Sequence, residues 1–245
     1  MVGSTTSTYN RRLQSLTYFD ILLGFTHFVG FVTICLSGYF MNTYSDGMGW
    51  PNKKNFGGSK LHGFLMLLAF VFFQGEALLA YRVYRYNVKI LSKLIHTMLH
   101  ICALGLGIFA LVLMIVNKNL HNADHFNSVH SWIGVSLLTI YILQFTFGFL
   151  TFLCPCSPGS YRARLLPLHR IVGAGCMIIG CIQCVIGFTT IINSPPACFS
   201  NLTCANRLEY VAYLSIMFIV LYTLLVLALI VPNSWKREKT PDEMN

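Results

Sequence analysis

Residues 93–116 read KLIHTMLHICALGLGIFALVLMIV, an apolar segment that carries His96 and His100 just inside its start. A short polar loop follows, and SVHSW at residues 128–132 then opens the next apolar segment with His130 at its start. A histidine inside a helix that crosses the hydrocarbon layer is unfavourable unless its imidazole binds something, so such a histidine usually has a function. Histidines at equivalent places in consecutive segments therefore indicate metal ligation.

The composition of the chain is that of a membrane protein. Its 245 residues are 55% hydrophobic and only 10% charged, whereas about a quarter of the residues in a soluble globular domain are charged. Six apolar segments have roughly the 20 residues that a helix needs to cross a bilayer: residues 18–40, 61–81, 94–116, 129–153, 166–192 and 210–231. The sequence thus predicts an all-α protein with a cytoplasmic N-terminal segment (1–17), a six-helix membrane domain (18–231) and a cytoplasmic tail (232–245).

The net charge of +9 comes from Lys and Arg residues that lie beside the apolar segments. Lys and Arg are more numerous on one set of flanks, which the positive-inside rule assigns to the cytoplasm together with both termini. No P-loop, dinucleotide fingerprint or nucleic-acid motif accompanies the charge, so nucleic acid is not an expected partner. The membrane itself is not identified, because the plasma membrane and secretory or endolysosomal vesicles share this topology.

One loop that this topology places outside carries candidate modification sites. Asn201 begins the tripeptide Asn-Leu-Thr, a glycosylation acceptor sequence. Cys198 and Cys204 lie in the same loop and are a candidate disulfide, because disulfides persist in oxidising compartments. The alternative is that both remain free thiols.

The predicted orientation sorts the histidines into two layers. His62 and His130 fall near the outer surface, and His169 falls near the cytoplasm with either His96 or His100. At 1.5 Å per residue, the layers are ~15–20 Å apart. Two imidazoles that face each other across a helical bundle suit haem, whose iron takes histidine as an axial ligand. Zinc is the rival metal, but it usually takes four ligands.

The helix that carries His169 has small residues on the same face. They follow at helical spacing: Gly173, Cys176, Gly180, Cys184 and Gly187. Small residues let a cofactor or a neighbouring helix approach closely. Helix packing alone is the simpler explanation, but the shared face with a histidine favours a cofactor.

Several motifs, in their order along the chain, resemble the cytochrome b561 family of six-helix membrane proteins, which carry electrons across a membrane between two b-type haems. They are LHGFLM (61–66), QGEALLAYR (74–82), KLIH (93–96), SVHSWIG (128–134) and LPLH (166–169). The resemblance covers nearly the whole chain from the first span to the sixth. It departs from the family at Gly63, where many members have proline after the histidine.

The resemblance implies a central four-helix bundle that holds two haems b. It assigns His62 and His130 as iron ligands of one haem and His96 and His169 as iron ligands of the other, so it selects His96 over His100. It also implies an ascorbate-dependent transmembrane reductase whose outer electron acceptor is ferric iron or monodehydroascorbate. No catalytic residue beyond the haem ligands is implied.

The family's usual donor, cytoplasmic ascorbate, is bound by basic residues beside the inner haem. Arg82, Lys93 and Arg162 occupy the matching positions, although the same charges would also set the membrane orientation. In the outer loop, His121 and His125 stand four residues apart and are candidate contacts for the acceptor. The alternative for these two histidines is a solvated polar loop.

Four further residues carry more limited expectations. His27 lies midway along the first span with no expected partner at its depth, and His100 is expected to pack beside His96 or support it. Glu76 lies deep in the second span and either assists proton movement or is protonated and structural. Pro167 is expected to begin the fifth span, where its missing N–H does no harm.

A histidine-lined, proton-coupled transporter without haem is the alternative function. Against it, no span carries the glycine and proline breaks that transporters commonly have within the membrane. A purely structural protein would not explain four equivalent histidines. The sequence leaves the oligomeric state open, a homodimer included.

Overall fold

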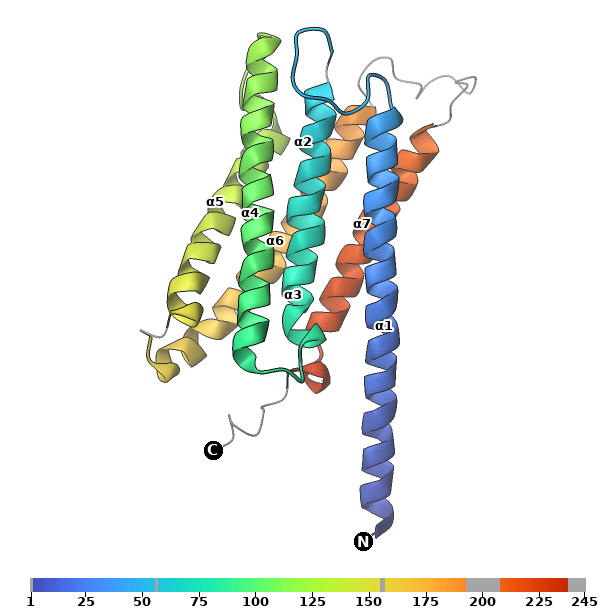
Figure 1. Ribbon diagram of the computed structural model, residues 1–245, viewed down its shortest axis with the longest axis vertical. Coiled ribbons are helices and arrows are strands. Elements are labelled where there is room, and N and C mark those ends of the chain that lie inside the picture. Colours follow the sequence, from blue (N-terminus) through green and yellow to red (C-terminus); the bar gives the residue numbers. More distant parts are fainter. Residues whose placement is uncertain (1, 56, 155–156, 193–207, 238–245) are drawn as a thin grey trace.

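The computed structural model describes residues 2–55, 57–154, 157–192 and 208–237, and nearly all of this part of the chain is helical (Figure 1). The elements are, in order, α1 (Val2–Thr43), α2 (Gly57–Leu67), the π-helix η1 (Leu68–Phe73), α3 (Gln74–Val83), α4 (Lys89–Leu120), α5 (Val129–Gly148), the π-helix η2 (Phe149–Leu153), α6 (Gly159–Ile192), α7 (Leu208–Ile230) and the 3₁₀ turn η4 (Asn233–Trp235).

Six of these helical stretches are long and apolar enough to cross a membrane, which confirms the predicted all-α, six-span protein. They cover Gln14–Thr43, Gly57–Val83, Lys89–Leu120, Val129–Leu153, Gly159–Ile192 and Leu208–Ile230. The second span combines α2, η1 and α3, and the fourth combines α5 and η2. The protein is therefore an integral, multi-pass membrane protein.

The spans form one bundle in which α1 packs along α7 at one side and α5 packs on α6 at the other (Figure 1). The second span lies between them and contacts both α4 and α6. The four spans that carry His62, His96, His130 and His169 are thus neighbours in the bundle. Large apolar side chains cover the outside, as Ile171 does at 70% exposure, which is what a lipid-facing surface requires.

Local chemistry explains some helix limits and corrects one expectation. The Ser128 hydroxyl accepts a hydrogen bond from the Ser131 N–H (3.2 Å) and so caps the start of α5. Pro167 does not begin the fifth span, because α6 begins at Gly159 and contains it. A proline inside a helix removes one backbone hydrogen bond. Near the end of a span, this loss is easier to accommodate than at its centre.

Candidate functional site

The inner cluster of histidines combines residues of α4, α5 and α6. The imidazoles of His96 and His169 have ring centroids 6.3 Å apart. A histidine nitrogen binds a metal at about 2 Å, so two imidazoles on opposite sides of one metal ion have centroids about 6 Å apart. The observed separation would therefore allow both imidazoles to hold one metal ion.

His96 is held in the tautomer that a metal ligand needs. Its Nδ1 lies 2.8 Å from the Ala77 carbonyl oxygen, which only accepts hydrogen bonds, so the proton is on Nδ1. The lone pair is then on Nε2 and available to a metal. Histidine ligands in proteins typically have such a partner on their other nitrogen.

His169 is positioned by Gln144 and Gly148 of α5. The Gln144 amide nitrogen donates to the His169 carbonyl oxygen (2.7 Å) and to His169 Nδ1 (2.9 Å), so the proton of this imidazole is on Nε2, where a bound metal would replace it. A Cβ atom at Gly148 would lie only 2.9 Å from His169 Cε1. The position of this imidazole therefore requires glycine at residue 148.

His100 lies beside His96 on α4, with ring centroids 4.4 Å apart. Its Nδ1 is 2.5 Å from the hydroxyl of Tyr141, which is buried. A hydroxyl either donates or accepts, so this contact does not place the His100 proton on Nδ1 as the Ala77 carbonyl does for His96. Of the two candidates on α4, His96 has the better environment for a ligand.

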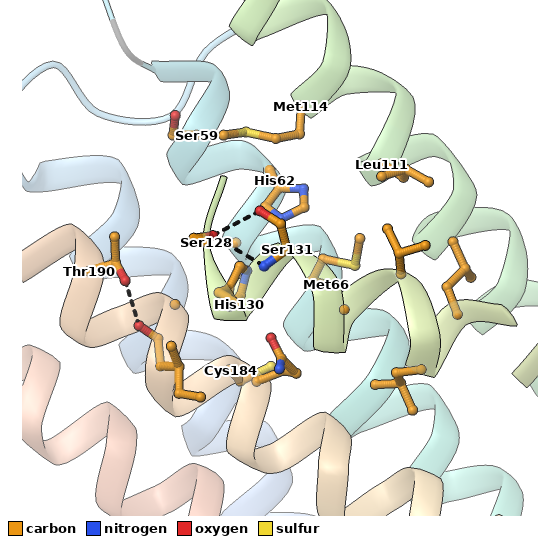
Figure 2. Close-up of a pocket in the computed structure, with 18 of the residues that line it drawn as sticks. Ser59, His62, Met66, Leu111, Met114, Ser128, His130, Ser131, Cys184 and Thr190 are labelled. Carbon is orange, nitrogen blue, oxygen red and sulfur yellow. Dashed lines mark hydrogen bonds between the residues drawn. The ribbon is translucent and has the colours of Figure 1, made fainter. Parts of the chain in front are cut away.

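The outer pair lines a cavity of about 610 Å³. Figure 2 shows His62 from α2 and His130 from α5 projecting into the same space, with Met66 and Cys184 on its walls. The His62 Nδ1–H donates to the Ala110 carbonyl oxygen (2.9 Å), which leaves Nε2 free to act as a ligand. Pockets for small molecules commonly have volumes of about 300–1,000 Å³ and mainly apolar walls. A flat, apolar cofactor suits this cavity.

Two residues of the cavity carry buried polar atoms without a partner among the described residues. They are His130, through Nδ1, and Gln183, through both atoms of its amide. Buried polar groups in proteins almost always have a hydrogen-bond partner, so unpaired ones at a cavity indicate a ligand. Sequence reasoning missed Gln183 because a single glutamine in an apolar helix has no motif. Gln183 lies fourteen residues, close to four helical turns, after His169. This spacing places both on the same face of the helix and could have indicated Gln183 as a site residue.

The two layers of histidines are well separated along the bundle. Ala110, the partner of His62, lies fourteen residues after His96 on α4. At 1.5 Å per residue, this spacing is about 21 Å. The outer pair and the inner pair are therefore distinct sites rather than one cluster.

The three predicted basic residues gather at the end of the bundle that holds the inner pair. Lys93 Nζ donates to the Phe152 carbonyl oxygen (2.6 Å), and the Phe152 ring lies 5.0 Å from the His169 ring. Arg162 is half-buried near the start of α6. Arg82 is 6% exposed and donates through Nη2 to the Ile230 carbonyl oxygen, while its buried Nη1 has no partner among the described residues.

The outer-loop histidines differ in their placement. His125 lies at the cavity, and its Nε2 is 2.7 Å from the Asn119 side-chain oxygen. The His121 Nδ1–H donates to the Asn117 carbonyl oxygen (2.8 Å), and His121 is not part of the cavity wall. Within the described ranges, no three His, Cys, Asp or Glu side chains gather as a metal site. Asn201, Cys198 and Cys204 lie outside the described residues.

The chain is similar to known proteins of one family. The model of the family "Eukaryotic cytochrome b561" matches residues 61–193, which include all four histidines of the two pairs. A Caenorhabditis elegans homolog of transmembrane ascorbate-dependent reductase CYB561 is 31% identical over 95% of this chain and 90% of its own length.

Two further relatives align over the central part of the chain. The mouse transmembrane ascorbate-dependent reductase CYB561 is 32% identical over 62% of this chain and 60% of its own length. The Arabidopsis thaliana transmembrane ascorbate ferrireductase 1 is 32% identical over 60% of this chain and 61% of its own length. The family match spans more than half of the sequence and the C. elegans relative nearly all of it, so the chain belongs to the eukaryotic cytochrome b561 family.

Proposed function

We propose that the protein is a transmembrane oxidoreductase that transfers electrons from cytoplasmic ascorbate, through two haems b, to an acceptor on the opposite side of the membrane. His96 and His169 would hold the inner haem, and His62 and His130 the outer one. The observation that carries the proposal is the 6.3 Å separation of the His96 and His169 rings together with the Ala77 carbonyl on His96 Nδ1.

The side chains around each pair do the work of binding and orientation. When bound, haem supplies one-electron chemistry at its iron. The Ala77 and Ala110 carbonyls hold the Nδ1 protons of His96 and His62, which fixes the ring orientation and makes Nε2 a better electron donor to a metal. Gln183 offers an unpaired amide to the polar edge of a cofactor in the outer cavity. The walls of the outer cavity are mainly apolar.

The donor is proposed to bind at the inner end, where Lys93 and Arg162 supply positive charge for the ascorbate anion. Arg82 is buried, so it would add positive charge near the site rather than a direct contact. The names of the relatives support ascorbate as the donor and ferric iron as an acceptor, with monodehydroascorbate as the second acceptor to test. The membrane is proposed to be the plasma membrane or a vesicle membrane, with both chain termini in the cytoplasm.

A charge change at Lys93 tests the donor site. We expect Lys93→Gln to raise the ascorbate concentration for half-maximal haem reduction by about five- to tenfold, the effect of about 1 kcal/mol or slightly more in a charge interaction. Stopped-flow reduction at low ionic strength measures this value. Lys89→Gln, also in the first turn of α4, is the control. Equal effects of both variants would show only general attraction by the positive end of the bundle.

The glycine beside His169 gives a second prediction. Gly148→Ala places a Cβ within 2.9 Å of the imidazole, so we expect the ring to shift and the inner site to bind haem less tightly. Overpacking of this kind typically destabilises by about 1–3 kcal/mol. The haem-to-protein ratio after purification measures the loss. Gly175→Ala on α6, where a Cβ meets nothing within 4 Å, should keep the wild-type ratio.

The visible spectrum of the purified protein tests the proposed function. We expect the spectrum of a six-coordinate b-type haem, which ascorbate reduces. A protein that takes up no haem would contradict the proposal and would instead favour the haem-free transporter. A bound haem that ascorbate leaves oxidised would contradict the choice of donor.

A further inference from the structure

A third group of polar side chains lies within the membrane-spanning helices and includes none of the four paired histidines. His27 Nε2 is 3.1 Å from one carboxylate oxygen of Glu76, and the Tyr222 hydroxyl donates to the other at 2.9 Å. The three residues come from α1, α3 and α7. The expectation that His27 has no partner is therefore wrong. Ionisable side chains within a membrane are functional by default.

The bundle is built to accommodate this group. Tyr222 is fully buried, and its ring packs between two glycines. A Cβ at Gly75 would lie 2.6 Å from the Tyr222 hydroxyl oxygen, and one at Gly30 would lie 2.7 Å from its ring. The π-helix η1 ends just before this region, and its Phe72 carbonyl is 3.4 Å from the same hydroxyl. Irregular helical turns of this type often occur at functional sites.

The group adjoins the inner site through two backbone connections. The residue after Glu76 is Ala77, whose carbonyl accepts the His96 hydrogen bond. His27 and Glu76 also line a crevice of about 460 Å³, and Ile95, the residue before His96, lies on its α4 side. A change of charge at the inner site is thus close enough to act on the carboxylate and the imidazole.

Few other ionisable groups face Glu76. Tyr222 approaches from α7, and Tyr84 lines the same crevice. The α4 side of the crevice supplies Ile95 and Leu99, and α6 meets α3 through contacts of Gln74 and Leu78 with Gly173, none of which titrates. Among the described residues, His27 is the one basic partner that these contacts give to Glu76.

We propose that His27, Glu76 and Tyr222 form a proton-binding site within the membrane, which would take up a proton when a haem held by the inner histidine pair is reduced. With one proton the imidazole and carboxylate are neutral as a pair, and a second proton makes the pair cationic. An added electron nearby favours that second proton by simple charge attraction. Tyr222 holds the carboxylate in place through its hydroxyl. This inference rests on the proposed function, because it needs a redox centre at the inner pair.

The charges balance in this scheme. The ascorbate monoanion loses one electron and one proton to become monodehydroascorbate. The electron goes to the inner site, and the proton enters the cytoplasmic water. The His27–Glu76 pair takes up one proton from that water and returns it when the electron leaves. The site therefore limits the charge that accumulates inside the membrane.

Redox titration of the haem-loaded protein between pH 5.5 and 8.5 tests the inference. We expect the inner haem's midpoint potential to fall as pH rises, by up to about 59 mV per pH unit, the value for one proton per electron. Glu76→Gln should flatten this slope and abolish the carboxyl band in the redox infrared difference spectrum. Glu209→Gln, which removes a carboxylate at the start of α7, should keep both signals.

Tyr222→Phe is the second variant, because it keeps the carboxylate and the aromatic ring. Without the tyrosine hydroxyl, we expect the inner haem's midpoint potential to depend on pH with the same slope, but over a measurably different pH range. A midpoint potential of the wild type that does not change with pH would overturn the inference. So would a midpoint potential with the same slope over the same pH range in wild type, Glu76→Gln and Tyr222→Phe. Loss of haem binding or of ascorbate reduction in the wild type would instead refute the proposed function and is seen directly in the spectrum.

Discussion

Replacing His96 by alanine is expected to lower the haem content from two per chain to one, with loss of the inner haem. The imidazole would be one of the two side chains that hold the inner haem, and the Ala77 carbonyl that accepts its Nδ1–H would be left without that donor. Removing only the hydrogen-bond partner of a metal-binding side chain typically lowers metal affinity by about 10–100-fold. Removing the metal-binding side chain itself should have a larger effect. Haem quantified against protein, together with a redox titration, measures the change.

His100→Gln is the matched control for this experiment. His100 lies one helical turn further along α4, with its ring 4.4 Å from that of His96, but its Nδ1 contacts the Tyr141 hydroxyl instead of a carbonyl. We expect this variant to keep both haems and to shift the potential of the inner one. Loss of a haem in His100→Gln with retention in His96→Ala would show that the ligand on α4 had been chosen wrongly.

His130→Ala is expected to remove the outer haem and to separate the two halves of the electron path. Ascorbate should still reduce the remaining inner haem, because His96 lies about 21 Å along α4 from Ala110, the residue that bonds His62 of the outer pair. Reduction of an acceptor on the opposite side should fall to the background of haem-free vesicles. Rapid mixing of the protein in vesicles, with haem spectra and acceptor reduction recorded together, measures both effects.

His125→Ala provides the comparison for the outer site. This histidine also lies at the cavity, but its Nε2 contacts the Asn119 side chain and it stands in an exposed loop. The variant should keep both haems. If His130→Ala retained two haems, or if it lost the inner one, the assignment of His130 to the outer pair would be refuted.

The six spans were predictable from the sequence because an apolar segment of about 20 residues has few alternatives to crossing a membrane. Helical spacing could not choose between His96 and His100 as the ligand, because residues four apart share a helix face, and only the family resemblance favoured His96. The structure adds the physical difference: the Ala77 carbonyl requires a proton on His96 Nδ1, whereas the Tyr141 hydroxyl sets no such requirement on His100.

The sequence did not predict contacts between segments that are far apart along the chain. His27 and Glu76 are 49 residues apart, and counting depth along straight spans did not bring them together. The π-helix at Leu68–Phe73 was also missed, and it changes the helical phase between His62 and Glu76. No residue pattern in that apolar segment distinguishes a π-helix from an α-helix. Gln183 became visible as a site residue only through its unpaired amide at the outer cavity.

Electron transfer across a sealed vesicle tests the central claim most directly. The protein is placed in vesicles that contain ascorbate, and an impermeant ferric chelate is added outside, with monodehydroascorbate tested in parallel. The account predicts acceptor reduction that depends on trapped ascorbate and disappears in both His96→Ala and His130→Ala vesicles. Reduction that survives in either variant, or no reduction by haem-loaded wild-type protein with either acceptor, would contradict it.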